Sequence, residues 1–350
     1  MLQDLIAEVA ALGPQQLLSL GICASYFGLI LWLFTRVLDS IQIASSQDKR
    51  RRKSSLIYLF WAVTVASFVH TWFYMFQYLA WSFSNFEAKN GIVASSGILT
   101  RVANWLCETS LYKEALAEIC FGKMSWWWDE QLWLFIVGIW EVFFYVEGSR
   151  HQIKHIWAFM LLSQIVAISA AYSLFCIALL SAKPRPLRKG WEVAVPAKLW
   201  IPVFLSMAAI QISPFTDGET FLLNRLILHV LTVLPLLSVS PLEKTTRAGL
   251  TLEYCHLAIF LCYIPLRIHT TRGASSVLPE DNKSLYVGLR NFWTHSHSRP
   301  VASPIVWDVL WAWISFEIWT LFASTSHLSS GIEPYMLPPR MPWDVEAKYD

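Results

Sequence analysis

The chain has 350 residues, of which 55% are hydrophobic and only 15% are charged. Soluble domains usually carry about 25% charged residues, so this composition excludes an ordinary soluble domain. The formal net charge of +2 gives no sign of a nucleic-acid partner, and none is expected. Several apolar runs reach about 20 residues, the length that crosses a bilayer. The composition therefore predicts an all-α, polytopic transmembrane helical bundle in contact with membrane lipid.

The apolar runs predict about eight membrane spans, with seven as the alternative. They lie at residues 15–36, 55–82, 131–147, 155–181, 197–213, 220–240, 248–267 and 304–325. The fifth span is short and contains Pro202. Neither an internal repeat nor a linker interrupts the pattern, so we expect a single integral membrane domain over residues 1–350.

The loops give a partial topology. Residues 49–53 are all Lys or Arg, which the positive-inside rule places in the cytosol. The basic residues of the 182–196 loop contradict that alternation, and the sequence leaves the topology there open. Residues 98–121 are amphipathic at helical spacing and predict an interfacial helical loop at about 98–122. Cys107 and Cys120 in this loop either form a disulfide or remain two thiols.

Glu141 lies within an otherwise apolar and aromatic run, LWLFIVGIWEVFFYVEG, from Leu132 to Gly148. An ionisable side chain inside the hydrocarbon costs about 2.5–3.5 kcal/mol on insertion scales and marks a functional site by default. Burial favours the neutral form of a carboxyl group. A proton held among Trp, Phe and Tyr side chains predicts acid chemistry on a hydrophobic substrate.

Three further acids complete the candidate catalytic set. Glu317 lies deep in the last predicted span, and Asp217 and Glu219 lie in the turn SPFTDGET before the sixth. Acids from separate segments with no metal motif between them predict a reaction in which a proton is donated and another is removed. This prediction requires Glu141 and Glu317 to face one common cavity.

Aromatic side chains accompany both deep glutamates at helical spacing. An aromatic face stabilises a cation by about 0.5–2 kcal/mol, so acids with an aromatic lining suit carbocation chemistry. The residues expected to line the substrate site are Trp140, Phe144, Tyr145, Glu147, His229 and Trp313.

Each of these residues also has a purely structural interpretation. The two deep glutamates can hydrogen-bond a neighbouring helix and orient the bundle. The two acids of the SPFTDGET turn can cap the helix that follows, because carboxylates are favoured near a helix N-terminus. His229 can be a satisfied core histidine, and Glu147 can form an interfacial ion pair with Arg150.

Several known motifs are absent from the sequence. There is no DDxxD, DxDD or NDxxD pair for a Mg²⁺-bound diphosphate, and no P-loop, GxGxxG or GxSxG. His151 and His155 form an HxxxH, but the several further clustered histidines of a membrane di-iron site are missing. We therefore expect no metal and no cofactor, and a substrate that is activated by protonation.

Three segments carry a resemblance to a known family: WEVFFYVEGSRH, SPFTDGE and the late FEIW. Together with the span pattern, they make the chain similar to the fungal membrane-bound terpene cyclases of meroterpenoid biosynthesis, of the ascofuranone-cyclase type. The resemblance implies an enzyme of secondary metabolism in the endoplasmic reticulum, with a hydrophobic prenylated substrate. In such enzymes an acid protonates an epoxide or alkene of a farnesyl-type chain and the carbocation cyclises. The four acids above then become the acid and base candidates.

The sequence is also compatible with two other functions. A sterol-isomerase-like enzyme uses similar acid–alkene chemistry on a rigid ring system. A non-catalytic accessory membrane protein or a transporter of a biosynthetic cluster needs no acid chemistry at all, although the repeats typical of many transporters are missing. The head group of the substrate, the ring formed and the oligomeric state do not follow from the sequence.

Overall fold

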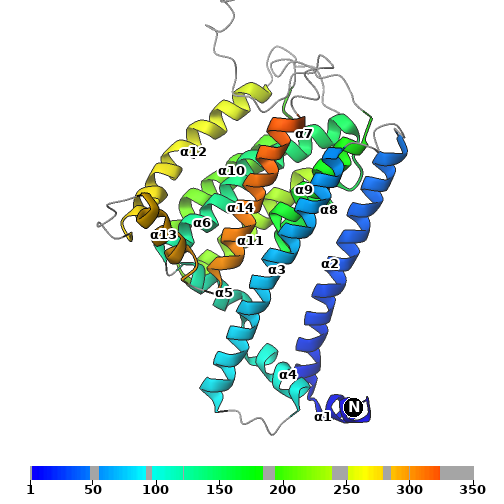
Figure 1. The fold of residues 1–350 in the computed structure, drawn as a ribbon, viewed down its shortest axis with the longest axis vertical. Helices are drawn as coiled ribbons and strands as arrows, with labels where there is room; N and C mark the ends of the chain where they lie inside the picture. Colours follow the sequence, from blue (N-terminus) through cyan, green and yellow to red (C-terminus); the bar gives the residue numbers. More distant parts are fainter. Residues whose placement is uncertain are drawn as a thin grey trace, which may run out of the picture.

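A computed structural model of the chain gives the arrangement of its helices (Figure 1). The structure describes residues 2–47, 55–91, 97–120, 122–183, 194–238, 251–278, 285–298 and 300–323. Within these residues the chain is almost entirely helical, and the backbone pairing outside helices is limited to one isolated bridge between Ala194 and Thr251. The prediction of an all-α helical bundle is confirmed.

Six helical runs are long and apolar enough to cross a membrane. Long apolar runs favour helices there because the hydrocarbon offers no water to the backbone N–H and C=O groups. The six runs are α2 (Pro14–Gln47), α3 (Ser55–Asn90), the continuous run α6–η2–α7 (Lys123–Phe135, Ile136–Trp140, Glu141–His151), α10 with η4 (Ala197–Ile212, Ser213–Phe215), α11 with η5 (Gly218–Val233, Leu234–Leu236) and α14 with η6 (Ala302–Ile318, Trp319–Ala323).

The predicted span at 155–181 is divided into two short helices, α8 (Ile156–Ile165) and α9 (Ile168–Ser181). Ala167 between them is extended, with φ −169° and ψ 134°. The break is stabilised by a residue far away in sequence, Asp308, whose carboxylate accepts the backbone N–H groups of Ile168 and Ser169 at 2.9 Å. This acid satisfies donors that the first turn of a helix leaves free.

The predicted seventh span forms α12 (Leu252–Ser275), which is not among the six most apolar runs. Its 24 residues are long enough to cross about 30 Å of hydrocarbon. However, it carries His256, Arg267 and His269 among its apolar residues, so its hydropathy is lower. α12 packs mainly along α6.

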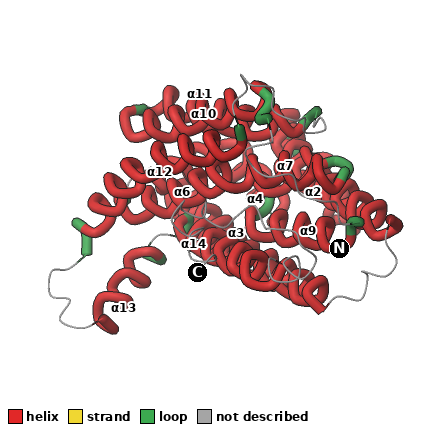
Figure 2. The backbone as a smooth tube through the Cα atoms, turned by 90° about the horizontal axis from the view of Figure 1, so that it is seen from above, coloured by secondary structure: helices red, strands yellow, loops and turns green. Residues whose placement is uncertain are grey.

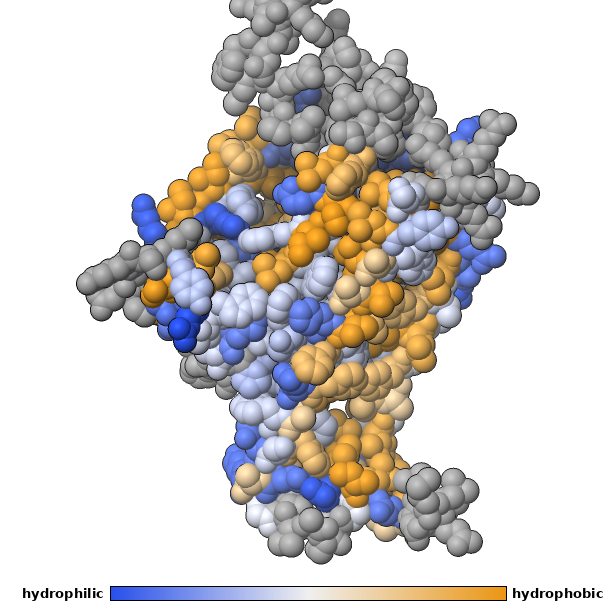
Figure 3. Space-filling model, in the orientation of Figure 1, coloured by the Kyte–Doolittle hydropathy of each residue, from blue (hydrophilic) through white to orange (hydrophobic). Residues whose placement is uncertain are grey.

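α9 forms the centre of the bundle, because every one of its residues is buried. It packs against α2, α3, α8 and α14. By contrast, the outer helices expose large apolar side chains, including Leu18 and Leu31 of α2 and Val65 and Val69 of α3. Figure 3 shows this apolar surface over α2. A surface of this kind suits hydrocarbon rather than water, as expected of a membrane protein.

The shorter helices lie at the margins of the bundle. The predicted helical loop at about 98–122 forms α4 (Ile98–Glu108) and α5 (Leu111–Cys120), and Cys107 within it has a free thiol. α1 (Leu2–Ala11) lies beside α4, where the Glu8 carboxylate accepts the backbone N–H of Leu99 at 3.3 Å. α13 (Leu285–Ser296) lies at the periphery in Figure 2.

Candidate functional site

Glu141 begins α7 immediately after the π-helical segment η2. A single π-helical turn within an α-helical run often lies at a functional site. The Glu141 side chain is 0% exposed, and within the described part of the chain neither carboxyl oxygen has a hydrogen-bond partner. Buried polar groups in native proteins are nearly always hydrogen-bonded, so this carboxyl group needs an explanation.

The face of the helix that carries Glu141 is packed against α12. Cys255 of α12 is fully buried and lies within electrostatic range of the Glu141 carboxyl group. One turn before Glu141, a Cβ placed on Gly138 lies 3.5 Å from Cγ2 of Ile259, also on α12. That distance is an ordinary van der Waals contact, so η2 and α12 are packed against each other in the turn before Glu141.

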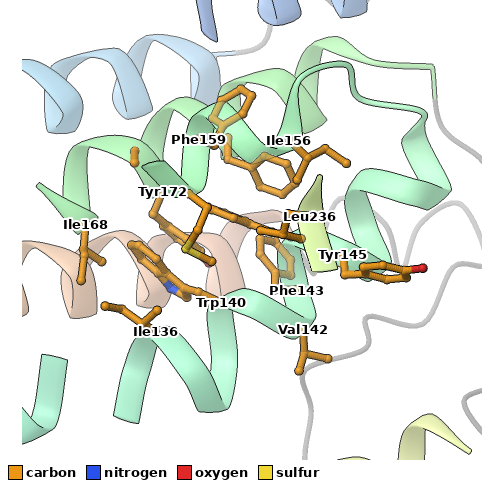
Figure 4. Packing of buried hydrophobic residues seen from close by; sticks show 14 of the residues in the cluster. Ile136, Trp140, Val142, Phe143, Tyr145, Ile156, Phe159, Ile168, Tyr172 and Leu236 are labelled. Carbon is orange, nitrogen blue, oxygen red and sulfur yellow. The ribbon is translucent and has the colours of Figure 1, made fainter. Parts of the chain in front are cut away.

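Trp140, the residue that precedes Glu141 in the chain, belongs to an aromatic stack in the core (Figure 4). The Trp140 ring stacks on the Tyr172 ring of α9, with 4.7 Å between centroids and 9° between planes. Phe144 stacks on Trp140 at 5.7 Å and contacts Phe175 at 4.3 Å. Two of the predicted lining residues thus form one fully buried cluster. The third, Tyr145, points away from the Trp140–Tyr172 pair in Figure 4.

Glu317 and Trp313 do not join Glu141 in one enclosed site. Glu317 is exposed on α14, whereas Glu141 is closed off inside the bundle. Trp313, one turn earlier, lies 6.3 Å from the Trp128 ring and 5.9 Å from the guanidinium carbon of Arg267. Among the described residues, the two glutamates therefore do not face one common cavity, as the prediction required.

Asp217 and Glu219 also lie apart from Glu141, because both are exposed at the start of α11. The backbone N–H of Asp217 donates to Thr220 Oγ1 at 3.0 Å, and this hydroxyl donates to Asp217 Oδ1 at 2.9 Å. These contacts are those of a helix N-cap. Glu219 lies in the first turn, where a negative charge interacts favourably with the helix dipole.

The last two predicted lining residues have structural partners. Glu147 is buried and pairs with Arg150 at 3.0 Å and with His151 at 3.4 Å, near the end of α7. The His229 Nδ1 atom lies 3.2 Å from Gln164 Oε1 of α8. The His229 ring also meets the Trp133 ring edge-on at 4.9 Å. His229 thus connects α11 to α8 and α6.

The structure reveals a buried ion pair that the sequence analysis missed, between Asp129 of α6 and Arg225 of α11. Arg225 is 3% exposed, and its guanidinium carbon lies 4.8–5.6 Å from the centroids of three aromatic rings. The rings are Trp126, Trp133 and Phe221. In the sequence, this pair is indicated only by the two acids of the WWWDEQ segment. They precede the predicted span at 131–147, whereas the helix in the structure begins at Lys123 and includes them.

Glu130 is the second acid of that segment, and it lacks such a partner. It is 3% exposed, and neither carboxyl oxygen makes a hydrogen bond within 3.5 Å to a described residue. Two residues of α12 nevertheless interact with the Glu130 carboxyl group: the Thr270 side chain as a hydrogen-bonding group and Arg267 as a nearby positive charge. No ion pair joins Glu130 to Arg267 within 4.0 Å among the described residues. Glu141 therefore differs from Glu130 on the same helical run, because no charged or hydrogen-bonding group among the described residues interacts favourably with the Glu141 carboxyl group.

A cavity of about 510 Å³ lies away from these acids, between α3 and the segment that follows α13. Its lining residues include no acid: Tyr74, Gln77, Trp81, Trp293, His297, Ser298, Pro300 and Ser303. Burial lowers the pKa of His297 below its usual value, and nearby His70 lowers it further, while a hydrogen bond to the Trp293 carbonyl opposes both. This cavity offers no carboxyl group to donate a proton.

Comparison with known proteins gives no relative. No protein-family model, no curated protein and no solved structure matches the chain. Within the described residues, no three His, Cys, Asp or Glu side chains are grouped so as to hold a metal ion. The fold and the site define the class only as a helical membrane protein with an isolated, fully buried carboxyl group.

Proposed function

We propose that the chain is a membrane enzyme that protonates a hydrophobic, prenylated substrate and guides its cyclisation, with Glu141 as the acid. The observation that carries this proposal is the Glu141 carboxyl group, which is fully buried without a partner among the described residues. Its neighbour in the chain, Trp140, belongs to an aromatic stack. The proposal includes the finer assignment to a terpene cyclase of meroterpenoid biosynthesis in the endoplasmic reticulum. That assignment is supported by the three segments that resemble this family.

The proposed reaction begins with transfer of the Glu141 proton to the oxygen of a terminal epoxide, or to a terminal alkene carbon. The epoxide C–O bond opens onto its oxygen, and the carbon left electron-poor is attacked by the electron pair of an internal alkene. A C–H bond beside the last cation then loses its proton to form an alkene. Because one proton is gained and one is lost, the product is an isomer of the substrate.

Glu141 is assigned both proton steps in this proposal. Asp217, Glu219 and Glu317 are exposed and cannot serve as a base within the closed bundle. The carboxylate of Glu141 and the substrate cation appear together in a medium of low dielectric, where their mutual attraction is strong. The Trp140 and Phe144 rings add cation–π stabilisation of about 0.5–2 kcal/mol each if the chain folds beside them.

The test uses microsomes that contain the full chain and a phenol bearing a farnesyl chain with a terminal epoxide. We expect a cyclised product of unchanged mass, and we expect Glu141→Gln to lower its rate at least about 100-fold, as for the loss of a general acid. Glu317→Gln is the matched control, because it makes the same change on the exposed surface, and it should keep the rate within about twofold. Equal rates in wild type and Glu141→Gln would remove Glu141 from the chemistry.

The close packing around Glu141 favours a second candidate, a non-catalytic membrane protein of a biosynthetic cluster. η2 and α12 pack against each other at Gly138 and Ile259, in the turn before Glu141. In that case purified protein has no activity on the farnesyl phenol or on a sterol alkene, and Glu141→Gln supports the same pathway flux in cells as the wild type. A product formed by the purified protein excludes this second candidate.

A further inference from the structure

Glu317 lies on the outer face of α14. Asp308, on the same helix, faces inward, where its carboxylate accepts backbone N–H groups of α9. The two residues are separated by about two and a half helical turns, so their side chains point to opposite sides of α14. Ile314, one turn before Glu317, is 43% exposed on the outer side. Figure 2 shows α14 at one edge of the bundle, so the Glu317 carboxyl group points away from the protein interior.

The ring contacts of its neighbours show how deep Glu317 lies in the membrane. The Phe316 ring lies 5.8 Å from that of Phe135, and the Trp319 ring lies 5.7 Å from that of Phe143. Glu317 is therefore level with the part of the α6–η2–α7 run between Phe135 and Phe143. This part is the middle of a run of 29 residues that is apolar enough to cross the membrane. Glu317 thus lies at the depth of the hydrocarbon rather than at that of the head groups.

The Glu317 carboxyl group has no partner within the described residues. The Thr320 hydroxyl donates at 3.1 Å to the backbone carbonyl of Glu317, and no hydrogen bond or ion pair reaches the carboxyl oxygens. The cavity of about 510 Å³ lies at the other end of α14, where Ser303 lines it. An acid within a membrane span almost always faces the bundle interior or a water-filled cavity and has a partner. The position of Glu317 therefore indicates a partner outside the single chain.

The chemistry of a carboxyl group favours a second copy of the chain as this partner. A medium of low dielectric favours the neutral form of a carboxyl group. A neutral carboxyl group has one O–H donor and an acceptor oxygen, so two such groups satisfy each other through two hydrogen bonds. Two copies in one membrane are related by a two-fold axis along the membrane normal, and residues near such an axis meet their own counterparts. Glu317 and Ile314 are both suited to a contact of this kind.

We propose that two copies of the chain associate through the outer faces of their α14 helices, with the two Glu317 carboxyl groups hydrogen-bonded to each other inside the membrane. The Ile314 side chains pack beside this pair. Lipid is as apolar as these side chains, so the hydrogen bonds rather than apolar burial select this face for association. Each copy keeps its own closed bundle and its own Glu141, and the interface does not depend on proton transfer by Glu141.

The test measures energy transfer between full-length chains that carry a donor or an acceptor fluorescent protein, reconstituted together in phosphatidylcholine vesicles over a range of protein-to-lipid ratios. We expect the wild type to follow a monomer–dimer equilibrium. Loss of the hydrogen bonds in Glu317→Leu should weaken association about tenfold. The amide of Glu317→Gln both donates and accepts, so this variant should stay within about threefold of the wild type.

The variant Glu317→Lys tests whether the two side chains meet directly. Two ammonium groups repel and cannot accept hydrogen bonds, whereas one ammonium group can pair with one carboxyl group. We therefore expect Glu317→Lys chains to associate with wild-type chains and not with one another. A variant that only disturbs the shape of α14 would weaken both combinations equally, and this outcome would overturn the direct contact.

Oxidative cross-linking locates the interface. Ile314→Cys should form a disulfide-linked dimer in vesicles, above the background that the chain's own thiols give in the wild type. Leu226→Cys is the matched control, because Leu226 is 58% exposed on α11, at the opposite edge of the bundle in Figure 2. Equal cross-linking at the two positions overturns the proposal. A wild type that stays monomeric at every protein-to-lipid ratio overturns it as well, and so does unchanged association of Glu317→Leu with wild-type helix content by circular dichroism.

Discussion

Asp129 and Glu141 lie on one helical run and are both buried, but their surroundings differ. Asp129 meets Arg225, whose cation is further held by three aromatic rings. Glu141 meets Cys255 and apolar side chains, and its oxygens have no partner among the described residues. Both acids are therefore buried, but only for Asp129 does a partner among the described residues compensate the cost of burial.

Asp308 extends this comparison to another helix. Its carboxylate accepts two backbone N–H groups and the Ser169 hydroxyl at the start of α9. Hydrogen bonds of this kind offset the cost of burying a charge. Asp129 and Asp308 thus have a structural role that their contacts explain, whereas Glu141 has no such contact among the described residues.

The largest expected effect on stability is that of Arg225→Met, which removes the partner of Asp129. This change leaves Asp129 buried without its cation, and breaking a buried pair on one side typically costs about 3–5 kcal/mol. We expect the free energy of unfolding to fall by that amount, measured by denaturant titration in micelles.

The double variant Asp129→Leu with Arg225→Met serves as its control. Removal of both charges leaves no uncompensated ion, so most of the lost stability should return. If the double variant is as unstable as Arg225→Met alone, packing around the guanidinium group rather than charge pairing explains the loss.

Replacement of Glu141, which has no partner among the described residues, should change stability in the opposite direction. Glu141→Leu removes a buried polar group that has no hydrogen bond, a group whose burial costs about 1–3 kcal/mol. We therefore expect this variant to be more stable than the wild type by about 1 kcal/mol or more in the same titration, while it loses any turnover. A loss of stability would mean that Glu141 has a structural partner, and the contrast with Asp129 would fail.

The sequence was sufficient for the fold class and for the buried position of Glu141, because both follow from apolar runs. It was not sufficient for the orientation of Glu317. Lipid is as apolar as a protein core, so the lipid-facing and inward-facing sides of a membrane helix carry similar residues. The same limit explains why Trp313 and Glu317, one turn apart, gave no indication of which side is exposed.

Other differences come from contacts between distant segments. The division of 155–181 into α8 and α9 depends on Asp308, about 140 residues further along, and no local signal in that apolar run marks the break. Asp129 and Glu130 lie outside the predicted span for a simpler reason, because the sequence pattern starts a membrane span only after the last charged residue. The partner of Asp129 lies 96 residues away in α11 and compensates its charge there.

The smallest expected effect is that of Asp217→Ala, which separates helix capping from catalysis. Asp217 exchanges hydrogen bonds with Thr220 at the start of α11, and loss of such a cap costs about 1 kcal/mol. We expect that loss in the denaturant titration and an unchanged rate per folded molecule in the microsomal assay. Glu219→Gln, at a neighbouring exposed position, should change stability by less than about 0.5 kcal/mol. If Asp217→Ala instead lost turnover while keeping its stability, Asp217 would be a catalytic group, and the assignment of both proton steps to Glu141 would be wrong.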